Sequence, residues 1–104
     1  MISRETEALG IFATHGVLDV VSTALAYEQM GASGETNPIV RSILLDYGIV
    51  DASFSILLVV ALVATIYPSV ARIGRFPPWF APLLIGVGLV SGAINLLVAS
   101  GALA

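Results

Sequence analysis

The chain has 104 residues, of which 58% are hydrophobic and 11% are charged, and its formal net charge is −3. Soluble domains average roughly 45–50% apolar and about 25% charged residues, and a chain this short could not bury so much apolar surface in one core in water. The lack of cysteine excludes disulfides and thiolate sites, and four arginines without a lysine argue against a nucleic-acid partner.

Three stretches of the sequence are long and apolar enough to cross a membrane as helices. A ~30 Å hydrocarbon core needs roughly 20 helical residues, and we expect spans over about residues 8–30, 52–71 and 80–104. The first span contains an Asp, which costs about 2.5–3.5 kcal/mol at the centre of a membrane helix, and its apolar neighbours can offset that cost. The sequence therefore predicts a single-domain, all-α membrane protein in a lipid bilayer.

The connector after the first span contains a strong helix start. Asn37 can cap unpaired amides and Pro38 fits the first helical position. Apolar residues then recur at helical spacing as far as Tyr47, and Gly48 follows. A helix over about residues 38–47 is too short to span, so we expect it to lie at the interface or to dip partway into the membrane.

The positions of the arginines predict the orientation of the chain. With three spans, the N-terminus and the connector before the third span share one side, which holds Arg4, Arg72 and Arg75, whereas the other side holds only Arg41. Cytoplasmic loops carry an excess of positive residues. We therefore expect a multi-pass protein of the cell membrane with its N-terminus inside and its C-terminus outside.

Polar residues inside the spans are the main candidates for a site. In the first span, polar side chains recur every four residues and should line one helix face: His15, Asp19, Thr23 and Tyr27. Asn95 lies about 15 residues into the third span, a depth of roughly 22 Å, and Thr23 reaches the same depth from the same side. The sequence therefore predicts an intramembrane polar cluster of Asp19, Thr23 and Asn95.

Two functions fit this predicted cluster. In the preferred one, the cluster fixes helix packing in a structural or accessory membrane subunit, which forms a homo-oligomer or joins a partner subunit. Gly88 and Gly92 support it, because small residues allow helices to approach closely. In the alternative, Asp19 exchanges protons, and several copies form a transport or permeation unit for protons or small cations, since intramembrane acids are common in ion pathways.

Other polar residues are weaker candidates. His15 could ligate haem or carry protons, although a lone histidine more often bonds a neighbour. Tyr27 suits an interfacial anchor, and Asp51 suits an N-cap before the second span. Glu35 could approach the cluster, but a loop acid is usually solvated. Since no enzyme motif occurs, we expect no catalytic residues, no metal, no cofactor and no enzymatic activity.

Three short motifs follow one another along the chain: Asp19-x-x-Ser22-Thr23, Glu35-x-Asn37-Pro38 and a late Asn95. Their order and intervals resemble those of a family of small uncharacterised multi-pass membrane proteins of archaea and bacteria. The resemblance implies which residues to test, but no activity, because none is established for the family. Relatives often carry a lysine near the start of the second span, where residues 51–55 of this chain contain no base.

Overall fold

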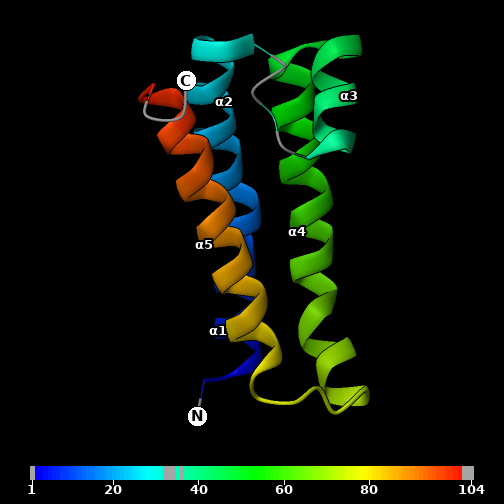
Figure 1. The fold of residues 1–104 in the computed structure, drawn as a ribbon. Coiled ribbons are helices and arrows are strands. Elements are labelled where there is room, and N and C mark those ends of the chain that lie inside the picture. Colours follow the sequence, from blue (N-terminus) through cyan, green and yellow to red (C-terminus); the bar gives the residue numbers. More distant parts are fainter. Residues whose placement is uncertain (1, 32–34, 36, 102–104) are drawn as a thin grey trace.

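The fold consists of helices throughout the part of the chain that the structure describes. This computed structural model describes residues 2–31, 35 and 37–101. Its elements are α1 (Arg4–Ile11), the π-helix η1 (Phe12–Leu18), α2 (Asp19–Met30), α3 (Pro38–Tyr47), α4 (Ile49–Ile73) and α5 (Phe80–Ala99). The first three form one continuous helix, and the described residues contain no strand (Figure 1). The predicted all-α class, with three long helices and one short one, is confirmed.

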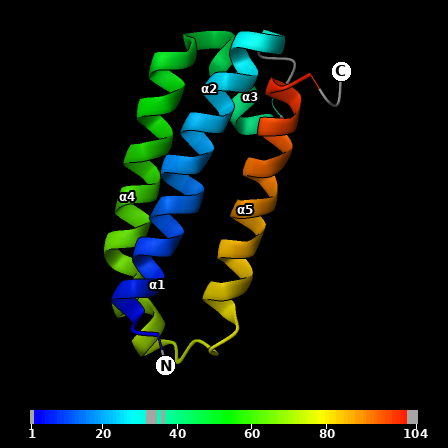
Figure 2. The same cartoon turned by 90° about the vertical axis from the view of Figure 1, so that its left-hand side faces the viewer.

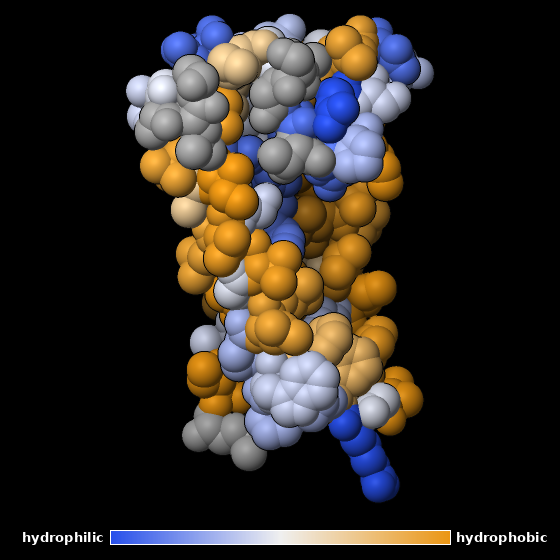
Figure 3. Space-filling model, viewed as in Figure 1, coloured by the Kyte–Doolittle hydropathy of each residue, from blue (hydrophilic) through white to orange (hydrophobic). Residues whose placement is uncertain are grey.

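All three long helices suit a small membrane protein. They run over Arg4–Met30, Ile49–Ile73 and Phe80–Ala99, with 27, 25 and 20 residues, and each is apolar enough to cross a membrane. At ~1.5 Å per residue, their lengths are roughly 30–40 Å, at least the thickness of the hydrocarbon core. Hydrophobic side chains cover the flanks of the molecule along most of its length (Figure 3).

The ends of the helices extend beyond the predicted spans at several points. The first helix begins at Arg4 instead of residue 8, because the Ser3 side chain accepts a hydrogen bond from the Thr6 amide at 3.1 Å and caps it. The second helix starts three residues before the predicted span and ends two residues after it. Helix α5 ends at Ala99, and residues 102–104 of the predicted third span lie outside the described residues.

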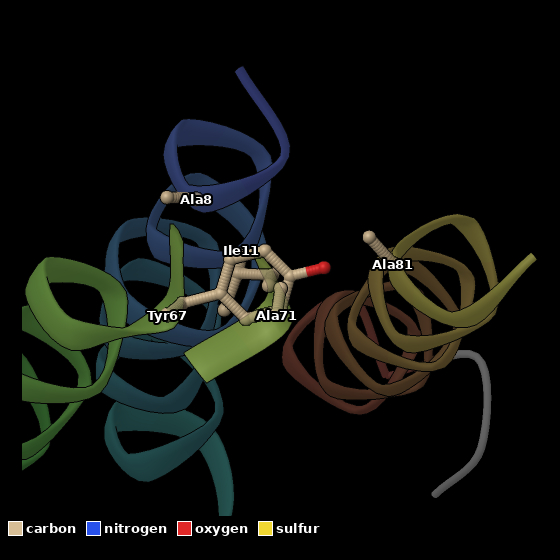
Figure 4. Packing of buried hydrophobic residues seen from close by; sticks show 5 residues of the cluster. All are labelled: Ala8, Ile11, Tyr67, Ala71 and Ala81. Carbon is tan, nitrogen blue, oxygen red and sulfur yellow. The ribbon is translucent and has the colours of Figure 1, made fainter. Parts of the chain in front are cut away.

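The first helix lies between the other two long helices (Figure 2). Its α1 half packs mainly on α4, and its α2 half packs mainly on α5. Two apolar clusters stabilise opposite ends of the bundle. One contains Ala8, Ile11, Tyr67, Ala71 and Ala81, shown in Figure 4, and the other contains Val40, Leu44 and Ala52.

Two glycines allow α5 to approach the first helix closely. A Cβ atom added to Gly88 would lie 2.8 Å from Thr14 Cβ and 3.0 Å from His15 Cδ2, and one added to Gly92 would lie 2.6 Å from Leu18 Cδ2. Both glycines are buried within the chain. Their small size therefore serves packing inside one protomer, and they give no support of their own to a contact between protomers.

Helix α3 lies alongside the first turns of α4 and runs in the opposite direction (Figure 1). Val40 packs with Ala52 in the second apolar cluster, and Asn37, just before α3, lines a cleft together with Val59. Val59 is ten residues beyond Ile49, the first residue of α4. At ~1.5 Å per residue, α3 thus begins about 15 Å along the bundle from its nearer end.

Candidate functional site

A hydrogen-bonded polar cluster joins the first helix, α5 and the connector before α3. Asn95 is fully buried, and its Nδ2 donates to Ser22 Oγ and Thr23 Oγ1, both at 3.3 Å. Thr23 Oγ1 also lies 3.1 Å from Asp19 Oδ1 and 3.2 Å from Glu35 Oε2. The structure therefore brings the predicted residues Asp19, Thr23 and Asn95 together, and it adds Ser22 and Glu35 to them.

Glu35 is buried, with 6% of its surface exposed, although it belongs to a connector. Its carboxylate is held from two sides, because Oε1 accepts a hydrogen bond from the Asn37 amide at 2.9 Å while Oε2 lies against Thr23. Its backbone carbonyl accepts a hydrogen bond from Arg41 Nε at 3.0 Å. Of the two alternatives for this acid, the structure therefore has the approach to the cluster and not the solvated carboxylate.

Asn37 and Pro38 start α3 and thereby position Glu35. The Asn37 side chain accepts hydrogen bonds from the amides of Ile39 and Val40, at 2.9 and 3.3 Å, and Pro38 is the first residue of the helix. These amides would otherwise have no partner inside the helix. The Glu-x-Asn-Pro motif is thus a helix start whose first residue directs a carboxylate at Thr23.

One buried acceptor in this cluster has no partner. Among the described residues, Asn95 Oδ1 is the single buried side-chain polar atom without a hydrogen bond. A buried polar group without a partner costs about 1–3 kcal/mol. Asn95 Oδ1 is therefore a buried acceptor that no donor of the described residues reaches.

The first helix widens into the π-helix η1 directly before Asp19. Such segments are rare and frequently occur at functional sites. His15 lies in this segment, and its Nε2 is 2.7 Å from the backbone oxygen of Leu84. Because a carbonyl oxygen can only accept, Nε2 carries a proton and donates it in this hydrogen bond. The other ring nitrogen, Nδ1, takes no part in this bond.

A cleft of about 280 Å³ opens beside the cluster, between the first helix, α3 and α4. Four polar residues line it: His15, Asp19, Asn37 and Ser55. The rest of its lining is aliphatic: Ile39, Val40, Ile43, Ile56, Val59 and Val60. Figure 3 shows a hydrophilic strip that runs between apolar flanks, from the α3 end toward the middle of the molecule.

Tyr27 and Asp51 are not part of this cluster. Tyr27 is half-buried and packs against the apolar cluster of α3 and α4. Asp51 is exposed in the first turn of α4, whose N-cap is Gly48. The predicted capping role of Asp51 is wrong because α4 begins three residues before the predicted span, although an acid in a first turn still suits the helix dipole.

A second polar group at the other end of the bundle was not predicted. Glu7 is 6% exposed, and its Oε1 accepts hydrogen bonds from Arg4 at 2.9 Å and from the Tyr67 hydroxyl at 3.2 Å. Arg4 also donates to the backbone oxygen of Phe76. The available signals were Ser3, a favoured N-cap residue that starts the helix before Arg4, and the three-residue spacing that places Arg4 and Glu7 on one face. This group ties the first helix to α4 and to the connector before α5.

Comparison of the chain with protein-family models, with curated proteins and with solved structures gave no match. Among the described residues, no group of three or more His, Cys, Asp or Glu side chains is placed to hold a metal ion. Fold and cluster together define a small helical protein suited to a membrane, with acids, a hydroxyl and an amide held between its helices.

Proposed function

We propose that this protein binds and exchanges a proton at Asp19, Thr23 and Glu35, and that it acts in the membrane as a transport or permeation unit without enzymatic activity. The position of Thr23 Oγ1 between two carboxylate oxygens supports this proposal. A hydroxyl has one proton and two lone pairs, and Asn95 Nδ2 occupies one lone pair. Thr23 can therefore bond fully to both acids only when one of the acids carries a proton.

The surroundings of the two acids also favour a bound proton. Two carboxylates that share a site disfavour each other's charged form. Among the described residues, ion pairs join Arg4 to Glu7 and Arg72 to Glu5, and none involves Asp19 or Glu35. Arg41 bonds the Glu35 backbone instead of its carboxylate. A proton shared by the two acids would reduce the repulsion between them.

Several copies of the chain, or a partner subunit, complete the proposed unit. Three helices enclose little space, and in one protomer the exposed face of α4 is apolar at Phe54, Leu58 and Leu62. We propose that lipid and further protomers cover such faces. Membership of the family that the sequence resembles stays a prediction.

The proton site predicts a vibrational signature. In lipid vesicles near neutral pH, the protein should show the infrared carbonyl band of a protonated carboxylic acid. Asp19→Asn and Glu35→Gln should each remove or shift this band, because each takes one acid out of the pair. The exposed Glu28 lies on the same helix, and the Glu28→Gln control should leave the band unchanged. A wild-type spectrum without the band would contradict the proposal.

A structural or accessory subunit is the second candidate. Asn95 supports it, because this buried amide connects α5 to two residues of α2 and would serve as a clasp. Vesicles reconstituted with the protein separate the two functions. A proton flux that Asp19→Asn abolishes supports transport, whereas a folded wild-type protein without any flux supports the subunit.

We also propose the orientation that the arginines favour, with the N-terminus on the cytoplasmic side of the cell membrane. A reporter domain fused to the N-terminus should then be active inside the cell, and one fused to the C-terminus should be active outside. The reverse pattern would overturn this orientation but would leave the proton site intact.

A further inference from the structure

The cleft beside Asp19 has hydrogen-bonding capacity that the fold does not use. Asp19 Oδ1 lies against Thr23, while its second carboxylate oxygen has no partner among the described residues. His15 donates through Nε2 to Leu84, and in the neutral imidazole Nδ1 can accept a hydrogen bond. The Ser55 hydroxyl likewise has no hydrogen-bond partner in the described part of the chain. A ligand in the cleft would therefore meet at least three acceptors.

The chemistry of this lining selects a cation with an apolar part. The carboxylate, the imidazole lone pair and the hydroxyl can all accept hydrogen bonds, and neither Arg nor Lys lines the cleft. Six aliphatic side chains form the rest of its wall. An anion would find no positive partner there, and a fully hydrated metal ion would leave the aliphatic wall in contact with its water shell. A protonated amine with a short alkyl chain suits both parts of the lining.

The size of the cleft limits the ligand. Its volume of about 280 Å³ equals roughly nine water molecules at ~30 Å³ each. A primary alkylammonium ion with a chain of about four carbons fits this space.

We propose that the cleft binds a small primary alkylammonium ion, whose ammonium group pairs with the Asp19 carboxylate in exchange for the proton of the acid pair. The binding site rests on the lining of the cleft, and the exchange rests on the proposed function. One monocation enters and one proton leaves to water, so the net charge of the site is unchanged. The Thr23 hydroxyl then donates its hydrogen bond to the Glu35 carboxylate, which does not line the cleft.

Calorimetry with n-butylammonium as the probe tests this assignment, on protein in lipid nanodiscs with empty nanodiscs as the blank. We expect saturable binding with release of about one proton, obtained by comparing the heats in two buffers of different protonation enthalpy. Neutral 1-butanol and anionic butyrate should not bind. Asp19→Asn should weaken binding roughly 10- to 100-fold, the range for a hydrogen bond to a charged group. Equal binding of 1-butanol would overturn the proposal.

A steric variant keeps the test valid if Asp19→Asn does not fold. Val59 lines the cleft and is exposed, so Val59→Trp should fill the cleft and abolish butylammonium binding while leaving the infrared band of the acid pair. Val63, one turn further along α4, is also exposed and does not line the cleft. The Val63→Trp control should bind normally. Binding that survives Val59→Trp would place the ion elsewhere and overturn the assignment.

The two proposals fail in different ways. If the infrared band is present but butylammonium does not bind, the assignment of the cleft is wrong and the proton site stands. If butylammonium binds at Asp19 without proton release and the band is absent, the cleft stands and the shared proton is wrong.

Discussion

Replacing Gly88 with alanine is expected to destabilise the protein by about 1–3 kcal/mol, the usual cost of adding atoms to a tightly packed contact. The added Cβ atom would lie 2.8 Å from Thr14 Cβ and 2.9 Å from Thr14 Oγ1. Thr14 cannot easily move away, because its Cβ is fixed to the backbone and its hydroxyl donates to the Gly10 carbonyl at 2.8 Å. The sign of this change in stability is informative, because a Gly-to-Ala substitution inside a helix usually stabilises a protein by about 0.5–1 kcal/mol.

Gly86 provides the matched control on the same helix. A Cβ atom at Gly86 would have no neighbour within 4 Å, so Gly86→Ala should leave stability unchanged or raise it slightly. At Gly92 the contact is with Cδ2 and Cγ of Leu18, both at 2.6 Å. The Leu18 side chain can adopt another rotamer, so Gly92→Ala should cost less than Gly88→Ala. Equilibrium unfolding in mixed micelles would measure all three. Equal stability of the Gly86 and Gly88 variants would show that this close approach does not limit the fold.

Replacing Thr23 with valine is expected to destabilise the protein by about 1–3 kcal/mol, because buried polar groups lose a partner while the side-chain volume is kept. Thr23 is 2% exposed. Its hydroxyl connects Asn95, Asp19 and Glu35, which come from three separate segments. The variant should also change the infrared band of the acid pair, since the two carboxyl groups lose the hydroxyl that lies between them.

Thr14→Val is the appropriate control for this substitution. Thr14 is also buried, but its hydroxyl bonds only to the backbone of its own helix, at Gly10 and Ile11. Its loss should cost less than that of Thr23 and leave the infrared band unchanged. Unfolding measurements and infrared spectra of both variants check this comparison. If the two threonines behaved alike, the central role of Thr23 in the cluster would be refuted.

The fold class could be predicted from the sequence because lipid imposes a simple rule on it. Each span must be a long apolar helix, and helical rise converts residue number into depth. This conversion is why Thr23 and Asn95 were expected at one level, where the structure has them bonded. The short helix over residues 38–47 was equally predictable, since Asn37 and Pro38 form a local start signal that needs no tertiary contact.

The positions of Glu35, His15 and Glu7 depend on tertiary structure and could not be predicted in the same way. Hydropathy predicts that an acid in a connector is exposed to water. Glu35 is buried because α3 packs against α4, which is a tertiary contact. Helical periodicity indicated neither the π-helix nor the hydrogen bond between His15 and the Leu84 carbonyl. Glu7 lay outside the predicted span, because a hydropathy boundary does not register the Ser3 cap.

The inward path of the chain before α3 has a consequence for biogenesis. Non-helical backbone inside a membrane is tolerated only where protein groups satisfy it; here Arg41 Nε bonds the Glu35 carbonyl, and the Glu35 carboxylate bonds the Asn37 amide. These contacts are local to residues 35–41, but the segment can dock only after α2 and α4 are in place, because α3 packs on α4 and Glu35 bonds Thr23 of α2. Docking of this segment should therefore be the last step of assembly, after translocon release, and until then the Glu35 carboxylate would remain accessible to cytosolic or external reagents.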